Sequence, residues 1–463
     1  MGIQDAVVLT TASRHAIDPS LITGGVSDIQ AFVDGQPLRA IHYAILALCC
    51  LVLFIDGYNI FVVGKIAPTI AAAYGSASTA MTSVFVLQQI GLAIGAFAAA
   101  PLADRFGRKR LLVVCLAMLG MLIALSPLAR TLSELAVLRC LAGFFLAGVL
   151  PVCIALIAEF SPRMQRARFI SIALLGFSAG TASGGIVAAW LVDIWSWKAA
   201  FWIGGIVPLA LLPLLLSALP ESLQYQVNRG SGPEHVLRGI RTIDPTAFIA
   251  PGRRLVSGDG SSGIRSASVA AILEQGRLAS TLVMWVTTFL SLGSVALLGA
   301  WLPTFFHELK GIPVQRFAAF VLWGFAGGLG GTLAAGWLMD RFRSSYTISV
   351  FFFGLAGSLL ALGFVPFGTP LFAALIIAWY FCQAGGQTLI HTLLSRIYPS
   401  KIRGTGMGWA GGTGGVGGIV APLLGGWALH AQFSLPVFML MAAAMPLVVA
   451  VVHLTMPVQS AKA

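Results

Sequence analysis

Charged residues are scarce in this chain. Only 10% of its 463 residues are Asp, Glu, Lys or Arg, and 58% are hydrophobic, whereas soluble domains contain about 25% charged and roughly 45 to 50% apolar residues. A difference of this size excludes a water-soluble fold. Acidic residues are rarer than basic ones, because the chain has 16 Asp and Glu and 28 Lys and Arg.

Motifs typical of enzymes and ATP-driven pumps are also missing. The sequence has no His-Glu-x-x-His helix, no phosphate-binding Gly-Lys-Ser/Thr loop and no intramembrane Ser-His-Asp set. Its six cysteines follow no metal-ligand or disulfide spacing, and each falls in an apolar run. We therefore expect no enzymatic activity, no cofactor and no bound metal.

Long apolar runs are what the chain has instead. A helix needs roughly 20 mainly apolar residues to cross the hydrocarbon layer of a membrane, and such runs recur along almost the whole sequence after residue 40. The pattern predicts an all-α membrane protein with twelve transmembrane helices. The predicted spans are 41–66, 81–102, 110–129, 134–159, 168–192, 198–219, 279–304, 316–339, 346–366, 370–395, 403–429 and 433–456.

A polar stretch divides these spans into two sets of six. Residues 220–278 contain many Arg, Ser and Gly and no continuous apolar run, which predicts a cytoplasmic linker. The expected organisation is an N-terminal segment 1–40, a first six-helix bundle 41–219, this linker, a second bundle 279–456 and a tail 457–463.

The two sets carry the same loop motifs. The triplet Asp-Arg-Phe at 104–106, after the second span, recurs at 340–342 after the eighth, 236 residues later. The pattern Pro-x-x-x-Arg at 162–166 recurs at 399–403, an offset of 237. Two motifs with nearly one offset indicate a duplicated unit, so we expect two pseudo-symmetric six-helix bundles.

Basic residues collect on one side of the expected membrane. An even number of spans puts both termini on the same side of the membrane. Of the 28 Lys and Arg, 22 fall in segments on that side and four fall in segments on the opposite side. Cytoplasmic segments carry such an excess. We therefore expect a multi-pass protein of the cytoplasmic (inner) membrane with both termini in the cytoplasm. Scattering between apolar spans also argues against a nucleic-acid partner, which requires clustered basic residues.

The repeated loops supply candidate gating residues. These are Asp104, Arg105, Gly107, Arg108, Asp340 and Arg341. An Asp at a helix end can pair with an Arg or with a neighbouring helix N-terminus, so such a cluster could close the cytoplasmic side in one state and release it in another. The alternative is a plain basic anchor of the cytoplasmic side.

The first of these loops resembles the signature of a known family. The run Ala-Asp-Arg-Phe-Gly-Arg-Lys at 103–109 is similar to the signature loop of the major facilitator superfamily, and Arg139 with Gly143 and Gly148 resembles its second motif. This resemblance implies the major facilitator fold, with two six-helix bundles that alternate in access to the two sides of the membrane.

Narrower motifs resemble one branch, the aromatic acid:H+ symporters, which include 4-hydroxybenzoate and benzoate transporters. The similar segments are Asp-Gly-Tyr-Asn at 56–59, Ala-Pro at 67–68, Pro-Glu-Ser at 220–222, Trp-Leu-Pro-Thr at 301–304 and Arg-Gly-Thr-Gly at 403–406. Two positions depart from that family's pattern. Asn59 stands where a second Asp is usual, and Gly415 stands where an Arg is expected.

The resemblance implies a monomeric secondary transporter in the lipid bilayer that takes up a small organic anion, an aromatic carboxylate, together with protons. Two other readings stay open. One is a carrier or exporter of a different metabolite with other coupling, and the other is a membrane receptor without transport.

Asp56 is the candidate proton-coupling residue. It is the acidic residue placed near the middle of a predicted span, where a carboxylate is costly unless it faces a cavity or a partner. A buried carboxylic acid holds its proton more tightly than one in water and can exchange it near neutral pH. Alternatively, Asp56 braces Arg139 or another polar group.

Seven polar and aromatic residues within the spans are candidate substrate-binding residues. They are Asn59, Arg139, Trp301, Gln383, Gln387, His391 and Trp409. Arg139 can pair with a carboxylate in bidentate fashion or brace the bundle. Gln383, Gln387 and His391 form a stripe on one helical face, which should face the bundle interior, and the tryptophans could stack a ring or serve as packing residues.

Lys65 and two glycine-rich faces complete the sequence evidence. Because Lys65 lies at the predicted outer end of the first span, it is expected to extend to the membrane interface, the alternative being an anion site at the outer vestibule. Small residues at Gly176, Gly180 and Gly184, and along 411–418, predict close helix contacts.

Overall fold

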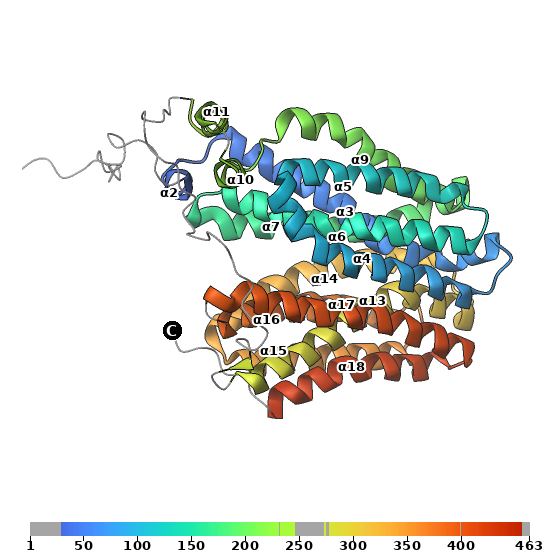
Figure 1. Ribbon diagram of the computed structural model, residues 1–463. Helices are drawn as coiled ribbons and strands as arrows, with labels where there is room; N and C mark the ends of the chain where they lie inside the picture. Colours follow the sequence, from blue (N-terminus) through green and yellow to red (C-terminus); the bar gives the residue numbers. More distant parts are fainter. Residues whose placement is uncertain (1–28, 231, 246–272, 275–276, 399, 456–463) are drawn as a thin grey trace, which may run out of the picture.

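The predicted fold class is confirmed by the computed structural model, which describes residues 29–230, 232–245, 273–274, 277–398 and 400–455. Within these residues, twelve helices are long and apolar enough to span a membrane, and they form two bundles (Figure 1). Most of the predicted N-terminal segment, much of the linker and the predicted tail lie outside the described residues.

Six long helices make up each bundle. Those of the first bundle are α3 (Ala40–Ala73), α4 (Met81–Phe106), α5 (Arg108–Leu125), α6 (Leu132–Phe160), α7 (Arg163–Trp190) and α9 (Lys198–Ala218). Those of the second are α13 (Leu278–Lys310), α14 (Val314–Arg341), α15 (Ser344–Leu362), α16 (Pro370–Ile397), α17 (Ser400–His430) and α18 (Leu435–Thr455). Short helices α2 (Ile29–Asp34), α8 (Val192–Trp195), α10 (Leu223–Asn228) and α11 (Pro233–Ile243) accompany the first bundle.

Helices pair in the same way in both bundles. In the first, α3 packs on α7, α4 on α6 and α5 on α9; in the second, α13 packs on α17, α14 on α16 and α15 on α18. The first, second and third helix of each half thus contact the fifth, fourth and sixth of the same half. This common pattern is what the repeated loop motifs predicted for a duplicated unit.

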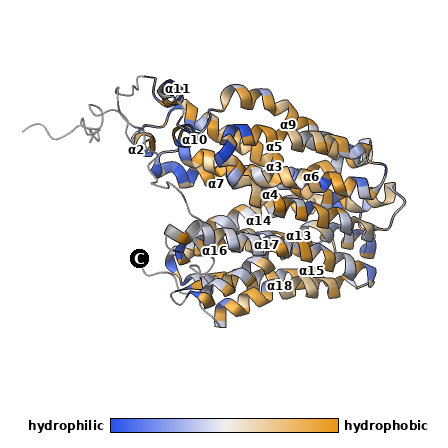
Figure 2. Cartoon of the chain, in the orientation of Figure 1, coloured by the Kyte–Doolittle hydropathy of each residue, from blue (hydrophilic) through white to orange (hydrophobic). Residues whose placement is uncertain are grey.

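Hydrophobic residues cover the bundles along their length, whereas hydrophilic residues are concentrated towards the helix ends and connections (Figure 2). Many large apolar side chains remain exposed on the helices, for example Phe97, Leu333 and Val350. In water such a surface would drive aggregation. In a bilayer it is solvated by acyl chains, as expected of a multi-pass membrane protein.

Glycines allow the close helix contacts that the sequence predicted. A Cβ atom at Gly180 of α7 would lie 1.8 Å from the main-chain oxygen of Phe54 on α3, and one at Gly417 of α17 would lie 2.0 Å from that of Phe289 on α13. Only glycine permits such an approach of two backbones. In each half, glycines of the fifth helix therefore allow its backbone to pack directly against the backbone of the first helix.

The two ends of the molecule differ, and we name them by their contents. The linker side carries α2, α10 and α11, where Arg39 binds Asp244 at 3.1 Å and Arg166 binds Asp34 at 3.1 Å. The far side carries the short 3-10 turns Ser78–Ala80 and Ser126–Leu128. The polar contacts of the linker side fasten the short helices to the first bundle.

Two polar or backbone contacts between the bundles lie in the far half of the helices. Gly64 of α3 faces Gly299 of α13 so closely that a Cβ at Gly64 would lie 2.1 Å from the Gly299 oxygen. Further out, Ser78 donates a hydrogen bond to Glu308 at 2.5 Å. These contacts close the seam between the bundles towards the far side.

The predicted spans agree with the helices to within a few residues, with two clear exceptions. Helix α3 runs to Ala73 rather than 66, and α13 runs to Lys310 rather than 304. Both continue through a proline, Pro68 or Pro303, which transmembrane helices tolerate because neighbouring groups satisfy the freed carbonyl. Lys65 consequently lies inside α3 rather than at its end.

Candidate functional site: a cavity between the bundles

Two cavities adjoin each other where the bundles meet. The first has a volume of about 250 Å³ and is enclosed by α3 and α7 of the first bundle and α13, α14 and α16 of the second. The second, of about 200 Å³, lies between α3, α4, α13 and α17. Phe61, Val295 and Gly299 belong to the walls of both cavities. Both halves of the protein therefore contribute to one central site.

Aromatic rings form much of the wall of the first cavity. They are Phe61, Phe177, Phe317, Phe325, Trp379 and Tyr380. The rings of Trp379 and Tyr380 are tilted against each other with centroids 4.6 Å apart, and Phe61 meets Phe177 edge to face at 6.5 Å. A planar apolar molecule would find faces and edges to pack against in this wall.

Lys65 is the charged residue of this wall, and the expectation that it extends to the membrane interface is wrong. Only 6% of Lys65 is exposed, and its ammonium group donates a hydrogen bond to the main-chain oxygen of Thr181 on α7. Gly184 leaves room for it, since a Cβ there would lie 3.3 Å from Nζ. The misplacement follows from the predicted end of the span, which falls seven residues too early.

Two glutamines of α16 share the wall with Lys65. Gln387 donates a hydrogen bond to Ser291 at 2.6 Å. The amide nitrogen and oxygen of Gln383 are both buried and have no hydrogen-bond partner among the described residues. A buried amide without partners is costly, and a ligand in the cavity could provide them. His391, the third member of the predicted stripe, is exposed and lines neither cavity.

Arg139 and Asn59 lie behind the cavities, inside the first bundle. Arg139 is 1% exposed, and its guanidinium group donates to Gln88 at 2.6 and 3.0 Å and to the main-chain oxygen of Asn59 at 2.7 Å. The Asn59 amide donates to Ile55 and Gly204 main-chain oxygens at 3.1 Å each. Of Arg139, Asn59 and Gln88, only Gln88 lines a cavity, and it belongs to the wall of the second cavity.

Asp56 is buried within the first bundle and does not face the exterior. Its side chain is 2% exposed, and one carboxyl oxygen has no hydrogen-bond partner among the described residues. Asp56 and Arg139 form no ion pair, so the bracing of Arg139 is done by Gln88 and a main-chain oxygen instead.

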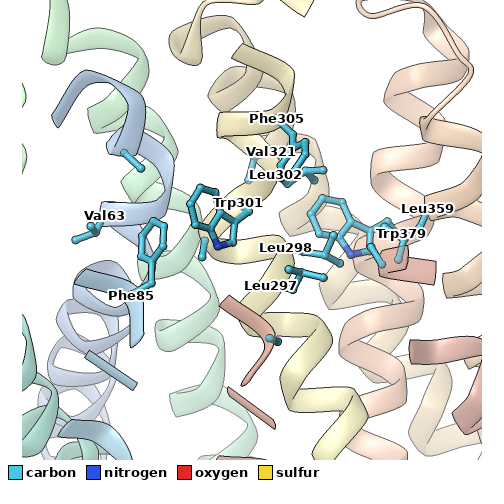
Figure 3. Packing of buried hydrophobic residues seen from close by; sticks show 14 of the residues in the cluster. Val63, Phe85, Leu297, Leu298, Trp301, Leu302, Phe305, Val321, Leu359 and Trp379 are labelled. Carbon is cyan, nitrogen blue, oxygen red and sulfur yellow. The ribbon is translucent and has the colours of Figure 1, made fainter. Parts of the chain in front are cut away.

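The two candidate tryptophans take part in packing. Trp301 is completely buried, donates its indole N–H to the Pro422 oxygen at 2.9 Å and meets Phe85 of the other bundle edge to face at 5.3 Å (Figure 3). Trp409 is half-exposed and stacks on Trp285 at 5.8 Å. Neither ring lines the cavities.

The candidate gating loop at 104–108 contacts its own bundle and the start of the linker. Arg108 forms an ion pair with Glu159 of α6 and a hydrogen bond to Ser222 at 3.1 Å. Gly107 has a φ of 97°, and a Cβ there would lie 2.7 Å from a carboxyl oxygen of Glu221. Glycine is therefore required at this position both by backbone conformation and by space.

Three other members of the two predicted gating clusters, Asp104, Arg105 and Arg341, are at the surface. Asp104 and Arg105 are exposed, and Arg341 lies over the ring of Trp337 at 4.4 Å. The side chain of Asp340 is outside the described part of the structure.

The aromatic wall could not be predicted from the sequence, because aromatic residues in an apolar span do not differ in pattern from ordinary packing residues. Phe61 lies one turn before Lys65 on α3, and this pair on one helical face was the available clue. This clue could not be used without knowing which face of α3 contacts the second bundle.

Two duplicated six-helix bundles with a central cavity between them define the architecture of a membrane transporter. The chain belongs to the Major Facilitator Superfamily, whose family model matches residues 49–377 and 319–462. The resemblance indicated by the sequence motifs is thus confirmed. A solved structure of the inward-open xylose transporter of E. coli shares this fold, with a TM-score of 0.68 at 16% identity over 91% of this chain and 97% of that one.

Curated relatives are transporters of aromatic acids. A gallate transporter of Pseudomonas putida is 33% identical over 410 residues, which cover 88% of this chain and 90% of the relative. A 4-hydroxybenzoate transporter of Pseudomonas aeruginosa is 34% identical over 411 residues with the same coverage. A benzoate transport protein of Acinetobacter baylyi is 28% identical over 412 residues.

Proposed function

We propose that this transporter takes up an aromatic carboxylate together with protons by alternating access. The observation that carries the proposal is the ring-lined cavity of about 250 Å³ enclosed by both bundles. Its volume lies just below the roughly 300 to 1,000 Å³ of sites for drug-sized ligands, which favours a small planar substrate. The aromatic acids in the names of the relatives support the same class.

The placement of contacts between the bundles supports alternating access. The Gly64–Gly299 approach and the Ser78–Glu308 hydrogen bond hold the seam together in the far half. Rocking of the bundles about the central cavity would separate these contacts and close the opposite end. The excess of basic residues supports a cytoplasmic position of the linker side and of both termini at an inner membrane, and we propose that this structure corresponds to a state open inwards. We propose that it acts as a monomer.

Proton coupling is assigned to Asp56, with Asn59 as a neutral neighbour one turn later. Both side chains are buried inside the first bundle, and one carboxyl oxygen of Asp56 has no hydrogen-bond partner among the described residues, which supports this role. A carrier that moves one proton with one monovalent anion transfers no net charge. It therefore draws on the pH difference alone, and one pH unit is worth about 1.36 kcal/mol, or tenfold accumulation.

Uptake into proteoliposomes tests the function. We expect saturable uptake of labelled 4-hydroxybenzoate or gallate that accelerates when the exterior is acidified and stops when a protonophore collapses the gradient. Initial rates must be compared with protein-free liposomes, because undissociated aromatic acids cross lipid unaided. Uptake of neutral or cationic compounds, with no response to any carboxylate, would defeat the proposal in favour of a carrier for another metabolite.

A further inference from the structure

Lys65 carries a positive charge into the protein interior without an ionic partner. Its side chain lines the first cavity at 6% exposure, and none of the ion pairs among the described residues includes it. An ammonium group has three N–H donors, whereas the described residues supply Lys65 with one acceptor, the Thr181 oxygen. A buried charge is normally paired because its desolvation is costly.

The surroundings keep this charge at the cavity. Gly184 and the backbone of α7 hold the ammonium group on the first-bundle side, and the rings of Phe61 and Phe177 flank it in the same wall. Across the cavity, the second bundle presents Gln383 with an unpartnered amide. A cation on one wall and rings around it complement an aromatic carboxylate.

Arg139, the other buried Lys or Arg in the described part of the structure, lies away from both cavities. Its Nε and Nη2 groups bind Gln88 and a main-chain oxygen inside the first bundle, and its Nη1 group is buried there without a partner among the described residues. The remaining basic residues of the far half, such as Lys310 and Arg316, are exposed near helix ends. Lys65 is therefore the cation available to a carboxylate in the first cavity.

We propose that Lys65 is the anion-binding residue of this transporter, and that its ammonium group pairs with the substrate carboxylate while the ring packs among the aromatic side chains of the wall. The inference rests on the proposed function, since it assigns the substrate charge within the same cavity. Because Lys65 belongs to the first bundle and most of the wall to the second, a bound anion links the two bundles. Binding also neutralises the buried charge before the bundles move.

Binding measurements on the purified full chain in detergent test this assignment. The probes are 4-hydroxybenzoate and its neutral analogue 4-hydroxybenzyl alcohol, and the variants are Lys65→Met and the matched control Lys310→Met, which removes a lysine that is exposed at the end of α13. We expect Lys65→Met to weaken binding of the acid on the order of 10- to 100-fold, the value of a hydrogen-bonded charge. Binding of the alcohol should change little, and Lys310→Met should leave both unchanged.

Thermal unfolding distinguishes a binding role from a structural one. Without ligand, Lys65→Met should unfold at the same temperature as the wild type or higher, because it removes an unpaired buried charge, and the acid should no longer raise that temperature. If Lys65→Met does not fold, Lys65→Gln keeps a donor for the Thr181 oxygen and serves in its place.

Two negative results have different meanings. A folded Lys65 variant that retains the wild-type preference for the acid over the alcohol overturns the assignment and leaves the proposed function intact. A wild-type protein that binds no aromatic acid overturns the proposed function and this assignment together.

Discussion

Polar residues of the first helix serve two different environments. Asp56 and Asn59 face the interior of the first bundle, whereas Lys65 faces the cavity between the bundles. Asp56 and Lys65 are nine residues apart, which is half a turn out of phase on a straight helix. We therefore assign the proton and the substrate anion to opposite faces of one helix, so that movement of α3 can couple them.

Replacing Asp56 by Asn tests the proton face of this helix. We expect the Asp56→Asn variant to lose uptake driven by a pH gradient, because an amide cannot exchange a proton, while exchange of preloaded for external 4-hydroxybenzoate continues. Proteoliposome assays of net uptake and of exchange measure the two separately. Glu234→Gln, at an exposed position of α11, is the matched control and should behave as the wild type. Undiminished gradient-driven uptake in Asp56→Asn would remove Asp56 from the coupling role.

Residue types alone predicted some positions and not others. Burial of Asp56 and Arg139 followed from the cost of charge inside a span. For Lys65, by contrast, the predicted span ended at residue 66, which put Lys65 at the helix end, whereas α3 continues through Pro68 to Ala73. Periodicity gives the face of a helix a residue occupies, but the neighbour that covers this face is set by tertiary packing. For that reason Gln383 and His391 share a predicted stripe, yet Gln383 alone of the two lines the cavity.

At the scale of helices, glycine faces determine how closely α3 and α7 approach. Helix positions were well predicted because long apolar runs bounded by charge have few alternatives in a membrane. The sequence indicated which helices pair only through small residues such as Gly176 and Gly180. Both of these glycines contact the backbone of α3 in the structure.

A methyl group at Gly180 should disrupt this helix pair. In Gly180→Ala the new Cβ would lie 1.8 Å from a main-chain oxygen, which cannot rotate away, so α7 must shift at a cost of about 1 to 3 kcal/mol, typical of overpacking. Thermal unfolding of the purified protein should show a lower midpoint. Gly336→Ala on α14 is the control, since no atom lies within 4 Å of its added Cβ; equal midpoints for the two variants would contradict the packing argument.

For the whole molecule, the seam between the bundles is the element that must open and close. In the far half the seam is held by backbone contacts and by Phe85 against Trp301. The sequence could not predict which end is closed, because the repeated loop motifs all lie on the linker side and stay the same in every conformational state.

Closing the far end permanently should separate binding from transport. A Cβ at Gly426 of α17 would lie 3.1 Å from the Cβ of Thr82 on α4, slightly inside the distance of about 3.5 to 4.5 Å found in disulfides. Oxidation of the variant Thr82→Cys/Gly426→Cys should therefore link the bundles across the far side. We expect the oxidised protein to take up no 4-hydroxybenzoate, and a reductant to restore uptake.

The same cross-linked protein should still bind 4-hydroxybenzoate in detergent, because the central cavity keeps its walls and is reached from the linker side. The two single-cysteine variants, oxidised in parallel, control for reaction of the native cysteines. Full uptake with the cross-link verified by mobility on a non-reducing gel would contradict alternating access through this seam. Loss of both binding and uptake would instead show that ligand enters the cavity from the far side, and would reverse the assignment of the open end.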